Sequence, residues 1–144
     1  MLSHRRRLEI EWGDCDAAGI VFFPRYFAMF DASTAYLFEK ALGEKKIAWV
    51  ERYGIVGIPM VDTGAVFRLP SRYGDVIEIE TAVREVGRSS IVLNHRVLKG
   101  EAVAIEAHEK RVWTGRDPAD PQRMTAVPLP AEVAAALKGT PIVR

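Results

Sequence analysis

The residues best suited to chemistry lie together in one short segment near the N-terminus, residues 12–24. The segment reads WGDCDAAGIVFFP and contains two carboxylates, Asp14 and Asp16, together with the thiol of Cys15 and two glycines. Pro24 fits the first turn of a helix, because the N–H that proline lacks would have no partner inside the helix at that position. The segment therefore predicts a strand end, an acidic turn and a helix start. A carboxylate beside the unpaired N–H groups of a helix start is a candidate chemical site.

Asp16 has two interpretations from the residues alone. Aspartate often shapes a turn or caps a helix, and it also serves as a nucleophile or a general base. Asp14 is expected to form a hydrogen bond within its own turn. Cys15 is expected to be a small buried residue rather than a nucleophile, because no histidine lies near it in the sequence.

A long helix is expected directly after the acidic turn. Residues 24–42 contain no glycine and no second proline, and their apolar residues recur at spacings of three and four. Gly43 is a natural C-terminal stop. Because the other faces also carry mainly apolar or small residues, we expect this helix to be buried on several sides.

The rest of the chain is dominated by the alternation of apolar and polar residues that is typical of strands. We expect strands over residues 7–12, 60–69, 76–86, 90–98 and 102–114, short helices over 44–53 and 131–138, and a loop over 117–130. Short connections require an antiparallel sheet, and the long helix is available to cover one face of it. The sequence thus predicts one α+β domain over residues 1–144, loop-rich from about residue 117.

The composition narrows the class of protein. With 144 residues, 49% of them hydrophobic, and a net charge of +1, the chain has no overall field that attracts nucleic acid or an anionic membrane. No apolar run approaches the roughly 20 residues that span a bilayer. The single cysteine excludes an intrachain disulfide and fits a reducing cytoplasm. The arginines at 5–7 are expected to form a frayed or solvated strand start.

Metal and cofactor chemistry is not expected. His4, His95 and His108 are scattered along the chain, so their spacing indicates no metal site, and His95 is expected to be packed rather than catalytic. No phosphate loop and no dinucleotide-binding motif is present. We therefore expect no cofactor.

The segment 13–24, GDCDAAGIVFFP, resembles the signature of the 4-hydroxybenzoyl-CoA thioesterase family. The resemblance continues at Tyr26 and residues 30–33, and returns at 54–59 and 75–81. It implies the hotdog fold, in which a curved antiparallel sheet of about five strands wraps around one long central helix. It also implies that Asp16 attacks a thioester or activates water, and that the backbone amide of Phe23 binds the oxyanion.

The same resemblance suggests residues for the substrate. Gly19 would let the backbone pass close to the ligand. Asp31 would either contact a polar substituent on the acyl group or hold a structural hydrogen bond, and Thr34 and Asp62 would line the same region. The turn after residue 86 would bind the coenzyme A part of the substrate through Arg88, Ser89 and Ser90. Three further arginines are unplaced candidates for that role: Arg68, Arg72 and Arg111.

The resemblance implies a cytoplasmic acyl-CoA thioesterase that hydrolyses an aromatic acyl-CoA, such as 4-hydroxybenzoyl-CoA, to the acid and coenzyme A. A thioesterase for short-chain aliphatic acyl-CoA is an alternative, and so is a non-hydrolytic hotdog protein that binds acyl thioesters. A hotdog dehydratase is disfavoured, because no histidine accompanies Asp16. One helix leaves much of the sheet uncovered, so a homodimer or homotetramer with a shared site is expected.

Overall fold

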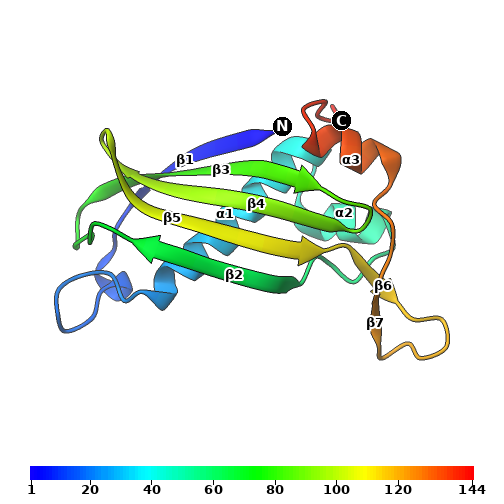
Figure 1. The fold of residues 1–144 in the computed structure, drawn as a ribbon, viewed down its shortest axis with the longest axis horizontal. Coiled ribbons are helices and arrows are strands. Elements are labelled where there is room, and N and C mark those ends of the chain that lie inside the picture. Colours follow the sequence, from blue (N-terminus) through cyan, green and yellow to red (C-terminus); the bar gives the residue numbers. More distant parts are fainter.

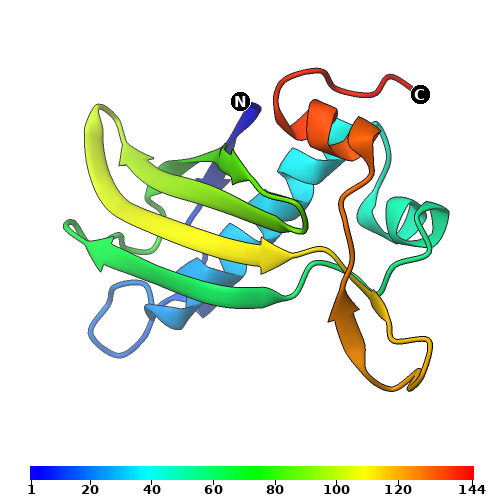
Figure 2. The ribbon, with the colours of Figure 1, turned by 45° about the vertical axis from the view of Figure 1, so that its right-hand side comes forward.

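A curved sheet of five antiparallel strands wraps around one long helix, α1 (Pro24–Leu42), in the computed structural model, which describes residues 1–144 (Figures 1 and 2). The strands lie in the order β1-β3-β4-β5-β2. Their bounds are Ser3–Glu9 for β1, Met60–Phe67 for β2, Val76–Val86 for β3, Ser90–Lys99 for β4 and Ala102–Val112 for β5. This arrangement confirms the expected α+β hotdog architecture.

Tight turns join the three central strands. β3 pairs with β4, and β4 with β5, each in antiparallel register. Gly100 makes the β4–β5 turn with a φ of +60°, a left-handed conformation that glycine adopts without strain. β1 pairs only with β3, and β2 pairs only with β5, so these two strands form the edges of the sheet.

α1 packs one face against the sheet. Pro24 begins it, and Gly43 ends it in a left-handed conformation, with its N–H donating to the carbonyl of Glu39. The expectation that α1 is buried on several sides is wrong for the single chain. No second layer of the chain covers the side of α1 that faces away from the sheet (Figure 2). Asp31 and Tyr36 of α1 are exposed.

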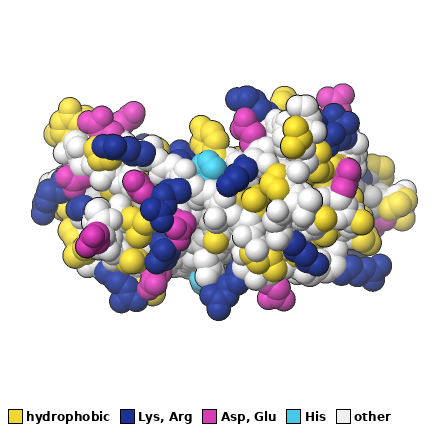
Figure 3. Space-filling view, turned by 90° about the horizontal axis from the view of Figure 1, so that it is seen from above, with side chains coloured by type: hydrophobic (Ala, Val, Ile, Leu, Met, Phe, Trp, Pro, Cys, Tyr) yellow, Lys and Arg dark blue, Asp and Glu magenta, His cyan; other side chains and the backbone are white.

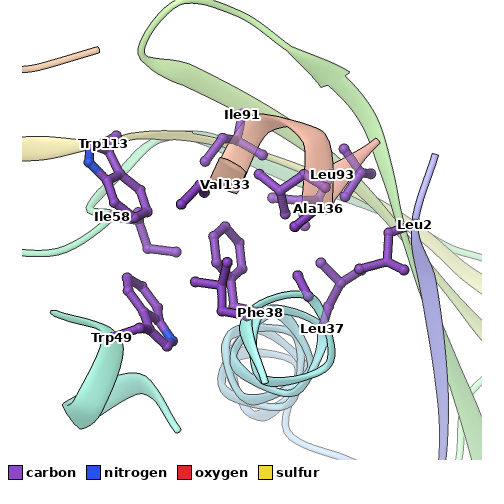
Figure 4. Close-up of a cluster of buried hydrophobic side chains, with 14 residues drawn as sticks. Leu2, Leu37, Phe38, Trp49, Ile58, Ile91, Leu93, Trp113, Val133 and Ala136 are labelled. Atoms are coloured by element: carbon purple, nitrogen blue, oxygen red, sulfur yellow. The ribbon is translucent and has the colours of Figure 1, made fainter. Parts of the chain in front are cut away.

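The C-terminal half of α1 is fixed in a core of aromatic rings (Figure 4). Trp49 of α2 (Lys46–Arg52) stacks on Phe38 at a ring-centroid distance of 5.3 Å and on Trp113 at 5.6 Å. α3 (Ala131–Leu137) contributes three buried side chains to the same cluster. A second apolar cluster lies under the first half of α1. The two cores together fix the direction of α1, and with it the position of its N-terminus.

The first strand differs from its expected position. It begins at Ser3 rather than at position 7, because the whole of Ser3–Glu9 pairs with β3. It ends at Glu9, which pairs with Val76, the first residue of β3. The expectation of a frayed or solvated arginine cluster holds only in part, because Arg5 and Arg7 are exposed but stand on a fully paired strand. Arg6 points inward, where its Nε donates to Ser33 Oγ at 2.8 Å and its Nη2 to the Met29 carbonyl at 2.9 Å.

The C-terminal tail contains more structure than the expected loop. Thr114–Arg116 (β6) pairs with Met124–Ala126 (β7) as a small hairpin that projects from the sheet, and α3 follows it (Figure 1). None of the helices combines the length and apolar character needed to cross a bilayer. On the face shown in Figure 3, basic and acidic side chains are interspersed rather than gathered by sign.

Candidate active site

A short 3₁₀ helix, η1 (Trp12–Asp14), opens the acidic turn. The Glu11 N–H donates to Asp14 Oδ2 at 2.9 Å, and the Asp14 N–H donates to the Glu11 carbonyl at 3.0 Å. Asp14 therefore forms the hydrogen bond within its own turn that the sequence predicts. Cys15 is half-buried, and its Sγ lies 3.7 Å from the Glu11 carbonyl.

Asp16 is held at the tip of the turn with one carboxylate oxygen in use. Its Oδ1 accepts the Ala18 N–H at 2.9 Å, and its backbone carbonyl accepts the Gly19 N–H at 2.9 Å. Gly19 has a φ of +78°, so a side chain there would strain the turn. The second carboxylate oxygen, Oδ2, has no partner in the chain. Asp16 thus both shapes the turn and presents a free, exposed oxygen.

A pocket of about 350 Å³ opens at this carboxylate. Trp12 and Tyr73 form its aromatic wall, with their rings edge to face at 5.6 Å. Cys15 and Gly19 also line it. The free oxygen of Asp16 can therefore meet a ligand of appreciable size.

The amide of Phe23 is a free donor at the start of α1. The neighbouring amides are used: the Phe22 N–H donates to the Asp14 carbonyl at 2.8 Å, and the Arg25 N–H to the Phe22 carbonyl at 2.8 Å. Pro24 has no N–H, and the Phe23 N–H has no acceptor in the chain. The partial positive charge at a helix N-terminus favours an anion at such a donor. The Phe22–Asp14 hydrogen bond ties this donor to the acidic turn.

A second pocket of about 250 Å³ lies beside Phe23. The turn that follows Gly19 forms one side of it, and the segment that follows β2 forms the other. Apart from Arg68 and Ser71, its lining is apolar or aromatic. The segment from the acidic turn to the helix start is therefore lined by two pockets, one at Asp16 and one between Phe23 and the segment after β2.

A buried polar network lies farther along α1, and the sequence reasoning missed it. Glu109 of β5 is 1% exposed, and it accepts hydrogen bonds from Thr34 and from Arg111, the latter at 2.8 Å. His95 Nε2 lies 3.0 Å from Glu109 Oε1. Arg111 also reaches Asp31 Oδ1 at 2.7 Å. Asp31 is therefore the exposed end of a chain of buried charges.

The electrostatics of this network follow from its partners. Burial alone would raise the pKa of Glu109, but the hydrogen bonds from His95 and Arg111 outweigh burial and hold the pKa at about 2. Burial lowers the pKa of the Arg111 guanidinium, and the two carboxylates more than restore it. Both groups are therefore charged at neutral pH. One signal in the sequence could have revealed the pair: Glu109 and Arg111 occupy successive inward positions of a strand whose earlier inward residues are apolar.

Of the four predicted substrate-binding residues, Gly19 lines the pocket at Asp16, whereas the other three lie away from that pocket within one chain. Asp31 is eight residues after Phe23 on α1, about 12 Å along the helix axis, and its carboxylate is paired with Arg111. Thr34 is buried against Glu109. Asp62 lies 3.1 Å from His108, on the outer face of the sheet that points away from α1.

The predicted coenzyme A turn lies at the far end of the sheet. Arg88, Ser89 and Ser90 follow the C-terminal end of β3, whereas the acidic turn adjoins its beginning. The eleven residues of β3 separate the two by about 35 Å. Of the unplaced arginines, Arg111 is occupied in the buried network, so it cannot bind phosphate. Arg68 lines the pocket beside Phe23, and Arg72 lies next to Gly19.

Comparison with known proteins identifies the chain. The family model described as the thioesterase-like superfamily matches residues 10–137. The chain belongs to the thioesterase-like superfamily. As a member of this superfamily it is a thioester hydrolase, and the motif 13–24 that predicted this activity falls within the matched region.

Individual relatives are consistent with this assignment. The 4-hydroxybenzoyl-CoA thioesterase of Pseudomonas sp. strain CBS-3 is 40% identical over 129 residues, which cover 85% of this chain and 89% of the relative. The structure resembles an aspartate-to-asparagine mutant of 4-hydroxybenzoyl-CoA thioesterase bound to 4-hydroxybenzoyl-CoA, with a TM-score of 0.86, 32% identity, and coverage of 95% of this chain and 99% of the other. It also resembles a gentisyl-coenzyme A thioesterase, with a TM-score of 0.80, 28% identity, and coverage of 93% and 99%.

Proposed function

We propose that this chain hydrolyses an aromatic acyl-CoA, such as 4-hydroxybenzoyl-CoA, to the free acid and coenzyme A. The observation that carries the proposal is that one turn bears both a free Asp16 oxygen and a free Phe23 amide, each at a pocket with an aromatic wall. Two of the relatives described above are named for thioesters of aromatic acids. Coenzyme A is part of the substrate here, and the reaction needs no cofactor.

The two free groups have complementary roles in the reaction. The Asp16 carboxylate forms a bond to the thioester carbon, or removes a proton from the water that does so. Negative charge then builds on the carbonyl oxygen, and the Phe23 amide with the α1 dipole behind it stabilises that charge. The C–S bond breaks and coenzyme A leaves as the thiolate. In the nucleophilic route, water then cleaves the mixed anhydride and regenerates Asp16.

The proposed active form is a homodimer, or a homotetramer built from two dimers, in the cytoplasm. The support is the edge strand β2, whose backbone is unpaired on one side and which carries exposed apolar residues. In such an assembly Arg88, Ser89 and Ser90 would contact a coenzyme A bound at another subunit's acidic turn. Asp31 would likewise contact a substrate only across a subunit boundary, because it lies too far from Phe23 of its own chain.

The variant Asp16→Asn tests the mechanism. It keeps the turn hydrogen bond, because the amide oxygen can still accept from Ala18, but it removes the nucleophile or base. We expect kcat for 4-hydroxybenzoyl-CoA to fall by a factor of about 10³ or more, with an unchanged unfolding midpoint. Asp14→Asn in the same turn is the control, and it should retain most of the activity. Turnover that survives in Asp16→Asn would contradict the proposed role.

The acyl group is tested by a substrate panel. Benzoyl-, 4-hydroxybenzoyl-, butyryl- and hexanoyl-CoA are compared by kcat/KM, with release of free thiol as the readout. The proposal expects the aromatic substrates to be preferred. Higher kcat/KM values for butyryl- or hexanoyl-CoA would instead favour the aliphatic alternative, and no turnover of any substrate would favour a non-hydrolytic binding protein.

A further inference from the structure

A partly buried guanidinium without a carboxylate partner lies on the inward face of the edge strand β1. The two hydrogen bonds that Arg6 makes both go to neutral groups, Ser33 Oγ and the Met29 carbonyl. Burial lowers the pKa of Arg6, and no carboxylate opposes this shift. Taking a charge out of water is costly unless an opposite charge compensates it. Arg111, the buried arginine of β5, has two carboxylate partners, so Arg6 is the one that lacks an anion.

A pocket of about 220 Å³ opens at Arg6, and its lining is basic and aromatic without any acid. It is lined by His4, Arg6, Arg7 and Tyr36. The Arg6 guanidinium lies 5.2 Å from the centre of the Tyr36 ring, and the His4 ring is stacked on that ring at 6.0 Å. Arg7 is exposed, and its guanidinium has no hydrogen-bond or ion-pair partner in the chain. Two uncompensated guanidinium groups therefore meet at one pocket.

The charges around this pocket are mainly positive. Burial lowers the pKa of His4, the positive charges of Lys40 and Arg6 lower it further, and only Glu39 opposes them. His4 is therefore neutral at neutral pH, and the guanidinium groups supply the charge of the pocket. Lys40 Nζ donates to the Ser3 carbonyl at 2.8 Å, a neutral partner, so its charge also adds to the local field. An anion in the pocket would be attracted by this field.

Arg6 keeps the donors that bind an oxyanion. A guanidinium has five N–H groups, and within the chain Arg6 uses one on Nε and one on Nη2. The remaining N–H groups lie on Nη1 and Nη2, and two neighbouring nitrogens can bind two oxygens of one phosphate or carboxylate. Two guanidinium charges favour the more highly charged of these groups. A phosphate monoester carries a charge of about −1.5 to −2 at pH 7, whereas a carboxylate carries only one.

The pocket at Arg6 is separate from the candidate active site. None of its residues lines the pockets at Asp16 or beside Phe23. Ser33, which accepts from Arg6, lies ten residues after Phe23 on α1, about 15 Å along the helix axis. The pocket also lies at β1, and β1 and β2 form opposite edges of the sheet. Pairing of two chains along β2 therefore does not cover β1.

We propose that the pocket formed by Arg6, Arg7, Tyr36 and His4 binds the phosphate group of a phosphate monoester. The free N–H groups of Arg6 and the guanidinium of Arg7 bind the phosphate oxygens, and the stacked rings form the wall for the organic group attached to the phosphate. This binding does not depend on the proposed hydrolysis of aromatic acyl-CoA. Two sources carry the required chemistry: the 3′-phosphate of coenzyme A, and a separate phosphorylated small molecule.

The test measures binding of phenyl phosphate by calorimetry, at constant ionic strength, in the wild type, Arg6→Gln and Arg7→Gln. We expect one saturable site per chain in the wild type. Binding should be about tenfold weaker or more in each variant, because each loses charge-assisted hydrogen bonds to the phosphate. Arg5→Gln is the matched control. It removes the same charge from the same strand, but Arg5 is already paired with Glu78 and Glu80, so its loss should leave the affinity unchanged.

The stability of the variants is measured alongside binding. Phenyl phosphate should raise the unfolding midpoint of the wild type and of Arg5→Gln, because a ligand of the folded state stabilises it. Arg7→Gln keeps the test decisive even where Arg6→Gln fails to fold, since the exposed Arg7 side chain has no partner in the chain. Equal affinity in the wild type and Arg7→Gln, or an equal loss in Arg5→Gln, would contradict the proposed site.

The source of the phosphate is tested with the 4-hydroxybenzoyl thioesters of coenzyme A and of 3′-dephospho-coenzyme A. A higher KM for the first thioester alone in Arg7→Gln assigns the pocket to the 3′-phosphate of coenzyme A. Unchanged KM values for both thioesters, together with the loss of phenyl phosphate binding, assign it to a separate molecule. No binding of phenyl phosphate by the wild type overturns the proposal. A change in sedimentation of Arg6→Gln without phosphate binding assigns Arg6 to a subunit contact and overturns it too. Absence of turnover contradicts the proposed function alone.

Discussion

The structural and the catalytic interpretation of Asp16 are compatible. One carboxylate oxygen accepts the Ala18 N–H and so orients the side chain, while the other has no partner in the chain. A catalytic carboxylate benefits from such an anchor, because less rotational freedom is lost when the substrate is attacked. The motif in the sequence predicts a catalytic role for Asp16, and the free oxygen is what that role requires.

A different carboxylate, Glu109, is expected to matter for stability. Its Oε atoms pair with buried cationic and hydroxyl groups, so Glu109→Gln leaves Arg111 with less compensation and should lower the free energy of unfolding by about 3 kcal/mol. Urea denaturation at pH 7 measures this change. Glu106→Gln, three residues earlier on the exposed face, is the matched control, and it should change the stability by less than about 1 kcal/mol.

The lowered pKa of Glu109 predicts that the free energy of unfolding depends on pH. The pKa of Glu109 is lowered from its ordinary value of 4.5 to about 2 in the folded protein. Its stabilising contribution is therefore complete above pH 4.5 and is lost as the pH falls towards 2, which amounts to about 3 kcal/mol over that range. Denaturation curves between pH 6 and pH 2 should show this loss in the wild type and not in Glu109→Gln. Parallel curves for the two proteins would contradict it.

At the scale of elements, α1 connects the candidate site at its N-terminus to the hydrophobic core at its C-terminal half. Its N-terminus supplies the free amide of Phe23, and its C-terminal half is fixed by the aromatic core around Trp49. Because the helix is anchored at one end in the core and tied at the other to the acidic turn, the proposed oxyanion donor and Asp16 keep a fixed position relative to each other.

The backbone donor can be tested without relying on a side chain. Phe23 has a φ of −53°, which proline also adopts, so Phe23→Pro removes the N–H at a compatible backbone position. Phe23→Ala removes the ring and keeps the N–H. We expect kcat to fall by about 10²–10³ in Phe23→Pro and by much less in Phe23→Ala, with both proteins folded by circular dichroism. Similar kcat values for the two variants would exclude the amide as the oxyanion donor.

The periodicity of the sequence predicted the helices and strands well where apolar and polar residues lie on separate faces of the element. β3 has the expected bounds, and α1 runs from Pro24 to Leu42 as expected. The predicted bounds of β1 were wrong because its inward face carries Arg6, whose partner Ser33 lies on another element, α1. The Asp31–Arg111 pair joins residues 80 positions apart, and no local pattern reports such a contact. The motif located the turn that we propose to be catalytic, whereas packing between distant segments decided what surrounds it.

At the scale of the whole molecule, one chain leaves surfaces that are unusual for a monomer. The edge strand β2 is unpaired on its outer side and exposes Val61 and Val66, and one face of α1 is uncovered. Natural edge strands usually carry charge, proline or a cover that prevents pairing. A second copy pairing along β2 would satisfy the backbone and bury these residues.

This arrangement predicts that assembly and activity depend on β2. Val61→Lys combined with Val66→Lys places two charges on the edge, and lysine on an edge strand opposes pairing. We expect the wild type to sediment as a dimer or larger species at micromolar concentration, and the double variant to shift to the monomer with at least a tenfold loss of kcat/KM. Val143→Lys is the control, because Val143 is 94% exposed in the C-terminal tail and should affect neither property. A fully active monomeric wild type would contradict a shared site, because the acidic turn and α1 would then be sufficient within one chain.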